Sequence, residues 1–135
     1  MPTPTSHPSV LLRTVERLGR RVLRRAGFKS RWISTDVGLI HVYDGVGQGT
    51  LPPLLLIHGV NATATSFQGV LTRLLPKAQR VVAIDLPAHG YSEVPDGGLS
   101  ADSLVAGTLQ ALDEVMPDVP AVVFGTSRGG IGAVR

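Results

Sequence analysis

The chain contains three short runs of consecutive apolar residues, at residues 54–57, 81–84 and 121–124. Continuous apolar runs of this length are typical of strands covered on both faces, because the side chains on both sides of the strand are then buried. The stretches between them, at about residues 65–75 and 101–115, have a helical pattern, and Ser100 is a candidate N-cap for the second, with Asp102 in its first turn. The order strand, helix, strand, helix, strand predicts an α/β fold with a parallel sheet and right-handed crossovers.

The hydrophobic pattern is different ahead of these runs. Between residue 10 and about residue 26, apolar side chains recur at the spacing i, i+4, i+7, i+11, which forms one stripe along a helix. The residues of this stripe are Leu11, Val15, Leu18 and Val22. Arginines fill much of the remaining helix surface, Ser9 is a candidate N-cap, and Gly27 is a candidate end of the helix.

Two β-rich segments, residues 31–35 and 39–43, flank a three-residue turn that ends in Gly38, and they predict a hairpin. Residues 1–9 contain three prolines and no hydrophobic period, which is typical of a loose leader. We therefore expect a flexible leader at residues 1–9, a basic amphipathic helix at 10–30 and a partial α/β domain at 31–135.

The net charge of +3 is spread unevenly along the chain. Residues 1–31 carry eight basic side chains against one acidic side chain, Glu16, whereas residues 32–135 carry five basic and nine acidic side chains. The basic character therefore belongs to the N-terminal segment, and it does not indicate that the folded body binds nucleic acid.

The chain has no cysteine, which excludes a disulfide framework and a thiolate metal site and fits a reducing compartment. Its longest apolar stretches, such as residues 51–57, are too short to cross a bilayer. We expect a cytoplasmic protein whose only membrane contact, through the basic segment, would be peripheral.

The third apolar run leads directly into the sequence Gly125-Thr126-Ser127-Arg128-Gly129. A G-x-S-x-G sequence after a buried strand is typical of a nucleophile elbow, a tight turn that raises a serine hydroxyl out of the sheet and opens a helix. The glycines are needed because a Cβ at either site would collide with neighbouring backbone. Ser127 is therefore the candidate nucleophile.

The other two apolar runs also end in polar motifs. His58-Gly59 follows the first run, and a loop from Asp85 to Ser92 that contains His89 follows the second. The carboxyl ends of parallel strands share one edge of a sheet, where open α/β sheets place their sites. The three motifs are therefore expected to lie together.

In the order and spacing of these motifs the chain resembles the α/β-hydrolase family, over about residues 31–135. The family has an H-G-x motif, a D-x-x-G-x-G-x-S-like loop and G-x-S-x-G after three successive strands, and this sequence has Ala88 where the loop usually has glycine. The resemblance implies the N-terminal half of a hydrolase sheet, in which a hairpin is followed by parallel strands with flanking helices. The basic helix precedes this common core.

The resemblance also implies a role for each motif residue. Ser127 would form an acyl-enzyme with a small-molecule substrate that has an ester or related acyl bond, and the backbone N–H groups of Val60 and Arg128 would form the oxyanion hole. The residues that would shape the surrounding loops are His58, Gly59, Asp85, His89, Gly125 and Gly129. No metal or organic cofactor is implied. A serine at the elbow disfavours the aspartate-nucleophile branches of the family, the epoxide hydrolases and haloalkane dehalogenases.

In this family the triad acid and the triad histidine follow the nucleophile along the chain. The eight residues after Ser127 contain neither. We therefore expect an incomplete chain, about half of the family core, that has little activity alone and leaves residues 121–125 as an exposed apolar edge. The alternative is a non-catalytic partial fold that acts as an interaction or membrane-surface module.

Three interpretations of the basic helix remain open. It lies on an anionic membrane surface through residues 10–31, it serves as an arginine-rich transit peptide, or it docks on the domain by its apolar stripe with the arginines in solvent. The docked helix is favoured, because most amphipathic helices of globular proteins pack by their apolar face.

Overall fold

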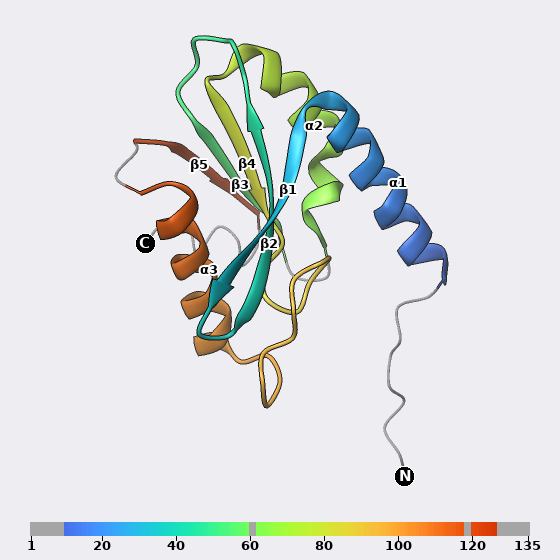
Figure 1. Cartoon of the computed structure of the whole chain (residues 1–135), viewed down its shortest axis with the longest axis vertical. Helices are drawn as coiled ribbons and strands as arrows, with labels where there is room; N and C mark the ends of the chain where they lie inside the picture. Colours follow the sequence, from blue (N-terminus) through green and yellow to red (C-terminus); the bar gives the residue numbers. More distant parts are fainter. Residues whose placement is uncertain (1–9, 60–61, 118–119, 127–135) are drawn as a thin grey trace.

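The computed structural model describes residues 10–59, 62–117 and 120–126, and within them a five-stranded sheet lies between helices (Figure 1). In chain order the elements are α1 (Val10–Ala26), β1 (Phe28–Thr35), β2 (Gly38–Val46), β3 (Leu54–Ile57), the 3-10 turn η1 (Ala64–Phe67), α2 (Gln68–Leu74), the 3-10 turn η2 (Leu75–Lys77), β4 (Arg80–Ile84), α3 (Ala101–Val115) and β5 (Val122–Gly125). Five residues singled out above lie outside the described residues: Ser9, Val60, Ser127, Arg128 and Gly129.

The strands are ordered β1-β2-β4-β3-β5 across the sheet. β1 and β2 form an antiparallel hairpin, β2 pairs antiparallel with β4, and β3 runs parallel to both β4 and β5. The predicted α/β class is confirmed, and the hairpin is longer than predicted, because its pairing extends to Phe28 and Gly45. Gly38 closes the hairpin turn with a φ of +111°, a conformation that glycine adopts without steric cost.

Helices cover both faces of the sheet, with α3 on one side and α1 and α2 on the other (Figure 1). The core under α3 contains Val82 and Ile84 of β4, and the core under α1 and α2 contains Val81 and Ala83 of the same strand. Successive side chains of a strand point to opposite faces, so a strand with a core on each side needs a continuous apolar run. The apolar pattern at residues 81–84 is explained in this way.

The predicted helix at residues 101–115 has the bounds of α3, and Ser100 is its N-cap. The Ser100 hydroxyl accepts a hydrogen bond from the N–H of Ser103 at 3.1 Å, while the Ser103 hydroxyl accepts one from the N–H of Ser100. The predicted helix at residues 65–75 is instead divided into η1, α2 and η2. Two local features account for the division: the Ser66 hydroxyl donates to the Thr63 carbonyl, and Pro76 lies in the first turn of η2.

β5 lies at the edge of the sheet and, among the described residues, pairs with β3 alone. Its apolar side chains are exposed: Val122, Val123 and Phe124. The expectation of a strand covered on both faces is therefore wrong for this run, because neither of the two cores contains a residue of β5. The apolar edge expected at residues 121–125 is present.

The amphipathic helix α1 docks on the body, but by a different face from the one expected. Gly19 and Leu23 are buried, whereas the stripe of Leu11, Val15, Leu18 and Val22 is exposed. A Cβ on Gly19 would lie 2.9 Å from the Thr65 Cβ, so only glycine permits this close approach of the helix to η1. Gly27 ends the helix with a φ of +114°, as predicted. In the described part of the chain, no helix is long and apolar enough to cross a membrane.

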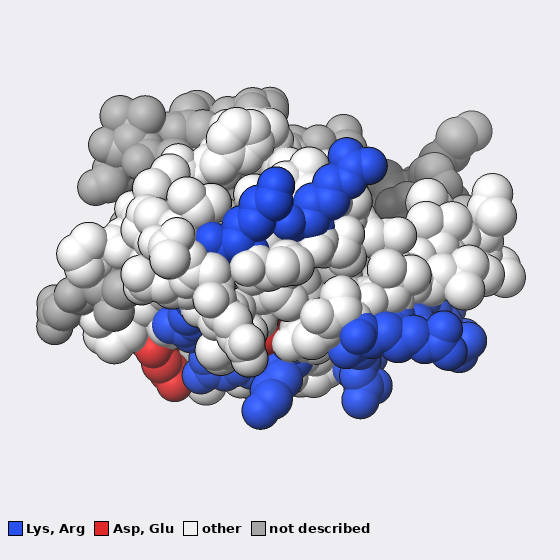
Figure 2. Space-filling model, turned by 90° about the horizontal axis from the view of Figure 1, so that it is seen from above, with Lys and Arg blue, Asp and Glu red and all other residues white. Residues whose placement is uncertain are grey.

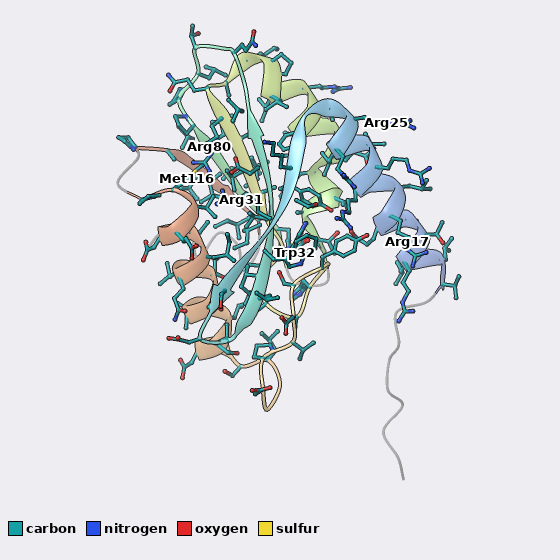
Figure 3. The ribbon with its side chains drawn as sticks, viewed as in Figure 1. Arg17, Arg25, Arg31, Trp32, Arg80 and Met116 are labelled. Atoms are coloured by element: carbon teal, nitrogen blue, oxygen red, sulfur yellow. The ribbon has the colours of Figure 1, made fainter. Side chains whose placement is uncertain are left out.

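A carboxylate on the hairpin ties three strands together. Asp44 of β2 accepts hydrogen bonds from Arg31 of β1 at 2.7 Å and from Arg80 of β4 at 2.9 and 2.7 Å, and both arginines are labelled in Figure 3. Burial raises the pKa of the Asp44 carboxyl, but the hydrogen bonds from Arg80 and Arg31 outweigh burial and hold this pKa below its usual value.

We expect Asp44→Asn to lower the free energy of unfolding by about 1–2 kcal/mol near neutral pH, because an amide of the same size loses the charge-assisted hydrogen bonds of a partly solvated cluster. The pKa of Asp44 is lowered in the folded chain, so its contribution is present above the usual carboxyl pKa and is lost as the pH falls through the lowered value. The difference between variant and parent should therefore shrink in acid.

Urea unfolding at a series of pH values measures this difference. Asp113→Asn, a substitution at an exposed position of α3, is the matched control and should leave the unfolding curve in place. A loss of stability for Asp44→Asn that stayed constant down to acid pH would contradict the role of the ionised carboxylate.

Candidate active site

The three parallel strands end at one level on the same edge of the sheet. Ile57 of β3 is in register with Ile84 of β4 and with Gly125 of β5. One residue further along, the N–H of Thr126 donates to the carbonyl of Ile57 at 3.2 Å. The loops that follow β3, β4 and β5 therefore begin side by side, and the expectation that the three motifs meet at this edge is correct for their described residues.

His58 is fully buried, and both of its ring nitrogens are occupied. The N–H of Leu86 donates to Nε2 at 3.0 Å, so Nε2 carries no proton, and Nδ1 donates to the carbonyl of Gly59 at 2.7 Å. The ring therefore connects the loop after β3 to the loop after β4. A general base needs a free nitrogen that reaches the substrate. Because both nitrogens of His58 are occupied, its contacts favour a structural role that holds the two loops together.

Burial lowers the pKa of His58, although the hydrogen bond to Gly59 and the charge of Asp85 favour the protonated ring. A second proton on the ring would have to displace the hydrogen bond from the N–H of Leu86. The folded structure therefore holds this histidine neutral.

We expect the His58 ring to stay neutral at pH values where an ordinary histidine, with a pKa of about 6.5, is half protonated. Because the unfolded chain binds this proton more readily, the contribution of His58 to stability is present above the unfolded pKa and is lost as the pH falls below it. NMR titration of the histidine ring signals measures the effect. A His58 signal that titrated at or above the ordinary value would show that the ring is not held as described.

Asp85, at the end of β4, has a fully buried carboxylate with three hydrogen-bond donors. Oδ1 accepts from the N–H of Ala64 at 2.9 Å, and Oδ2 accepts from Nδ1 of His41 at 2.8 Å and from the N–H of Tyr91 at 3.3 Å. The donors come from the turn after β3, from β2 and from the loop after β4. The carboxylate thus holds three segments around the edge of the sheet and is not directed at an open site.

His41 is a residue that sequence reasoning missed. It is fully buried on β2, its backbone N–H donates to the Ser92 hydroxyl at 2.8 Å, and its carbonyl accepts from the N–H of Asp85 at 2.9 Å. Aromatic rings surround it, with centroids 4.7 Å (Trp32), 4.6 Å (Tyr43) and 5.3 Å (Tyr91) away. The sequence did contain a signal, since His41 lies between two apolar residues of a predicted strand. A polar side chain buried at such a position needs a hydrogen-bond partner elsewhere in the chain.

The loop after β4 contains two positions with an unusual backbone. Ala88 has a φ of +66°, the left-handed conformation that a glycine would adopt without strain, and this is the position where the family pattern usually has glycine. Gly90 has a φ of +54°, and a Cβ there would overlap the carboxyl group of Asp85. His89, between them, is half-buried, and its Nδ1 donates to the Pro87 carbonyl at 2.9 Å. Backbone geometry therefore wraps this loop around Asp85.

We expect Gly90→Ala to destabilise the fold by about 1–3 kcal/mol more than Gly97→Ala, because overlap with Asp85 adds to the cost of a side chain at positive φ. Gly97 is a matched control, since its φ is +79° and a Cβ there would meet nothing within 4 Å. Thermal or urea unfolding of the two variants measures the difference. Equal losses of stability would contradict the close packing of Gly90 on Asp85.

The structure brings together the motif residues it describes, which are His58, Gly59, Asp85, His89 and Gly125. The roles proposed for Ser127, Arg128, Gly129 and Val60 remain predictions, since these residues lie outside the described ranges. Within residues 10–59, 62–117 and 120–126 there is no group of three or more histidine, cysteine, aspartate or glutamate side chains placed to hold a metal ion.

Residues 54–135 match the model of the alpha/beta hydrolase family. The chain therefore belongs to the alpha/beta hydrolase family.

Individual relatives differ in their activities. The chain is 36% identical over 83 residues to a protein of Mycobacterium phage D29 that is provisionally named a non-heme haloperoxidase, a match covering 61% of this chain and 29% of that protein. It is 33% identical over 88 residues to an esterase of Mycobacterium tuberculosis, covering 64% of this chain and 28% of the esterase. An epoxide hydrolase structure from an endophytic Streptomyces is 28% identical with a TM-score of 0.62, covering 80% of this chain and 32% of the hydrolase. The chain thus spans less than a third of each relative.

Proposed function

We propose that this chain carries the nucleophile of a serine hydrolase, and that Ser127 attacks an ester or related acyl bond of a small-molecule substrate. The observation that carries the proposal is the common level of β3, β4 and β5, with Ile57 in register with both Ile84 and Gly125. Ser127 comes two residues after Gly125, at the edge where open α/β sheets have their sites. Membership of a family of hydrolases supports the same chemistry.

The reaction requires a negative charge to be stabilised on the acyl oxygen. When the Ser127 oxygen bonds to the acyl carbon, its proton passes to a base, and the leaving group departs with that proton. Water then releases the acid from the acyl-enzyme. The amides of Val60 and Arg128 are the proposed donors to the acyl oxygen, and the loss of one such donor typically costs about 10²–10³ in rate.

The described residues support this chemistry by holding the two loops next to the elbow, which follow β3 and β4. His58 connects the loop after β3 to the loop after β4, and Asp85 binds the N–H of Ala64 just beyond the proposed oxyanion loop. An oxyanion hole acts through fixed donors, so rigid loops beside Val60 favour it.

Two alternatives are weighed against this proposal. Relatives of this fold include an epoxide hydrolase, a branch with an aspartate nucleophile, but this chain has serine at the nucleophile position of its G-x-S-x-G sequence. The second alternative is a partial fold without catalysis, which acts as an interaction or membrane-surface module. Both alternatives predict that Ser127 is not activated.

A fluorophosphonate probe, which bonds covalently to activated serines, tests the proposal on the protein purified from its natural source. We expect the adduct on Ser127, located by mass spectrometry of peptides. Ser127→Ala should abolish labelling and lower turnover of an activated ester by at least about 10⁴-fold. Ser34→Ala, a change at an exposed position of β1, is the matched control and should leave both unchanged.

An unlabelled Ser127 in a sample where another serine hydrolase reacts with the probe would overturn the proposal. In that case the non-catalytic alternative would be the better account of the chain.

A further inference from the structure

The inward face of α1 takes up the only acidic side chain of the helix. Glu16 accepts hydrogen bonds from the hydroxyls of Thr63 and Thr65, the latter at 3.0 Å. Gly19 and Leu23 complete this inward face, where Leu23 is fully buried. The charge that α1 presents to solvent is therefore purely positive.

The outward surface of α1 has an apolar part, the stripe described above. The exposed fractions of its side chains are 71% for Leu11, 55% for Val15, 55% for Leu18 and 40% for Val22. An apolar surface this continuous along one helix is unusual where the helix is already docked, because docking normally buries it.

The outward surface also has a basic part. An open hollow of about 520 Å³ is lined by Arg17, Arg20, Arg21, Arg24, Arg25 and Tyr91. The guanidinium of Arg20 lies against two aromatic rings, 5.3 Å from the ring of Trp32 and 5.0 Å from the ring of Tyr91. The other four arginines are exposed, and among the described residues none of them forms an ion pair. Figure 2 shows several Lys and Arg side chains projecting from the lower side of its view, and Figure 3 shows Arg17 and Arg25 on α1.

The two parts lie next to each other around the helix. With about 3.6 residues per turn, Leu18 and Leu11 follow Arg25 and Arg21 around the circumference, and the buried face of Gly19 lies beyond the stripe. We call this outward surface, formed by the stripe and the five arginines, the α1 surface.

We propose that the α1 surface binds the surface of an anionic phospholipid membrane. Guanidinium groups match phosphate oxygens with paired N–H donors, and an adjacent apolar stripe suits the boundary between headgroups and acyl chains. A nucleic acid would satisfy the arginines but would leave the stripe in water. The absence of acidic side chains from the α1 surface completes the complementarity to anionic headgroups. This proposal does not depend on the activity of Ser127.

Vesicle flotation of the whole chain tests the proposal, because vesicles rise in a density gradient while aggregated protein sinks. The sample is cleared by ultracentrifugation first, so that only dispersed chain is assayed. We expect the chain to float with vesicles in which about a third of the lipid is phosphatidylserine and not with phosphatidylcholine alone. Raising the salt concentration should weaken binding, since exposed charges are then screened.

Two pairs of variants separate the basic part from the apolar part. Arg21→Glu with Arg25→Glu should weaken binding roughly 25-fold or more, at about fivefold for each basic residue removed. Arg73→Glu with Lys77→Glu changes the net charge equally at exposed positions away from the hollow, and should have little effect. Leu11→Gln with Leu18→Gln should also weaken binding, whereas Leu109→Gln on α3 should not.

Three results would overturn the proposal. The first is a dispersed chain that fails to float with anionic vesicles. The second is equal loss of binding in the two charge variants, which would mean that net charge and not the α1 surface is responsible. The third is unchanged binding after Leu11→Gln with Leu18→Gln, which would exclude insertion of the stripe.

Discussion

The edge of the sheet that carries the motifs depends on one buried hydrogen bond, between the Asp85 carboxylate and the ring of His41. A buried carboxylate is costly unless donors satisfy its oxygens. Asp85 meets that requirement with donors from three segments, and His41 reaches it from β2, on the far side of β4 from β3. If either partner were lost, the other would be left buried without its hydrogen bond. The antiparallel hairpin therefore helps to hold the loops at the ends of β3 and β4 in place, through the contact of His41 with Asp85.

Sequence reasoning succeeded where a local pattern has one structural solution. The continuous apolar runs at residues 54–57 and 81–84 predicted strands with a core on both sides, as found, and Ser100 before an apolar periodic segment predicted the start of α3. The run at residues 121–124 is equally apolar but belongs to an edge strand whose side chains are exposed. A local apolar pattern predicts a strand, but it does not show which strands or helices pack against that strand.

Two other outcomes depended on long-range contacts. The apolar stripe of α1 predicted which face would pack, but the contact was decided by Gly19, which allows a close approach to Thr65, and by Glu16, which binds two threonine hydroxyls. Neither residue stands out in a hydrophobic pattern. His41 was missed for a similar reason, since its partner Asp85 lies 44 residues away along the chain. A polar residue in an apolar context signals that a partner exists but does not identify it.

The docking of α1 also decides where the folded unit starts. Leu23 belongs to the same core as Phe28, Leu71 and Leu75, while the part of the chain that matches the hydrolase family begins at residue 54. A fragment cut to the limits of family similarity would lose α1 together with the hairpin. It would remove Leu23 and Phe28 from the core that contains Leu71 and Leu75, and it would leave Asp85 without His41. The minimal folded unit for expression or crystallisation is therefore longer than residues 54–135, the segment that matches the family, and it includes the basic helix.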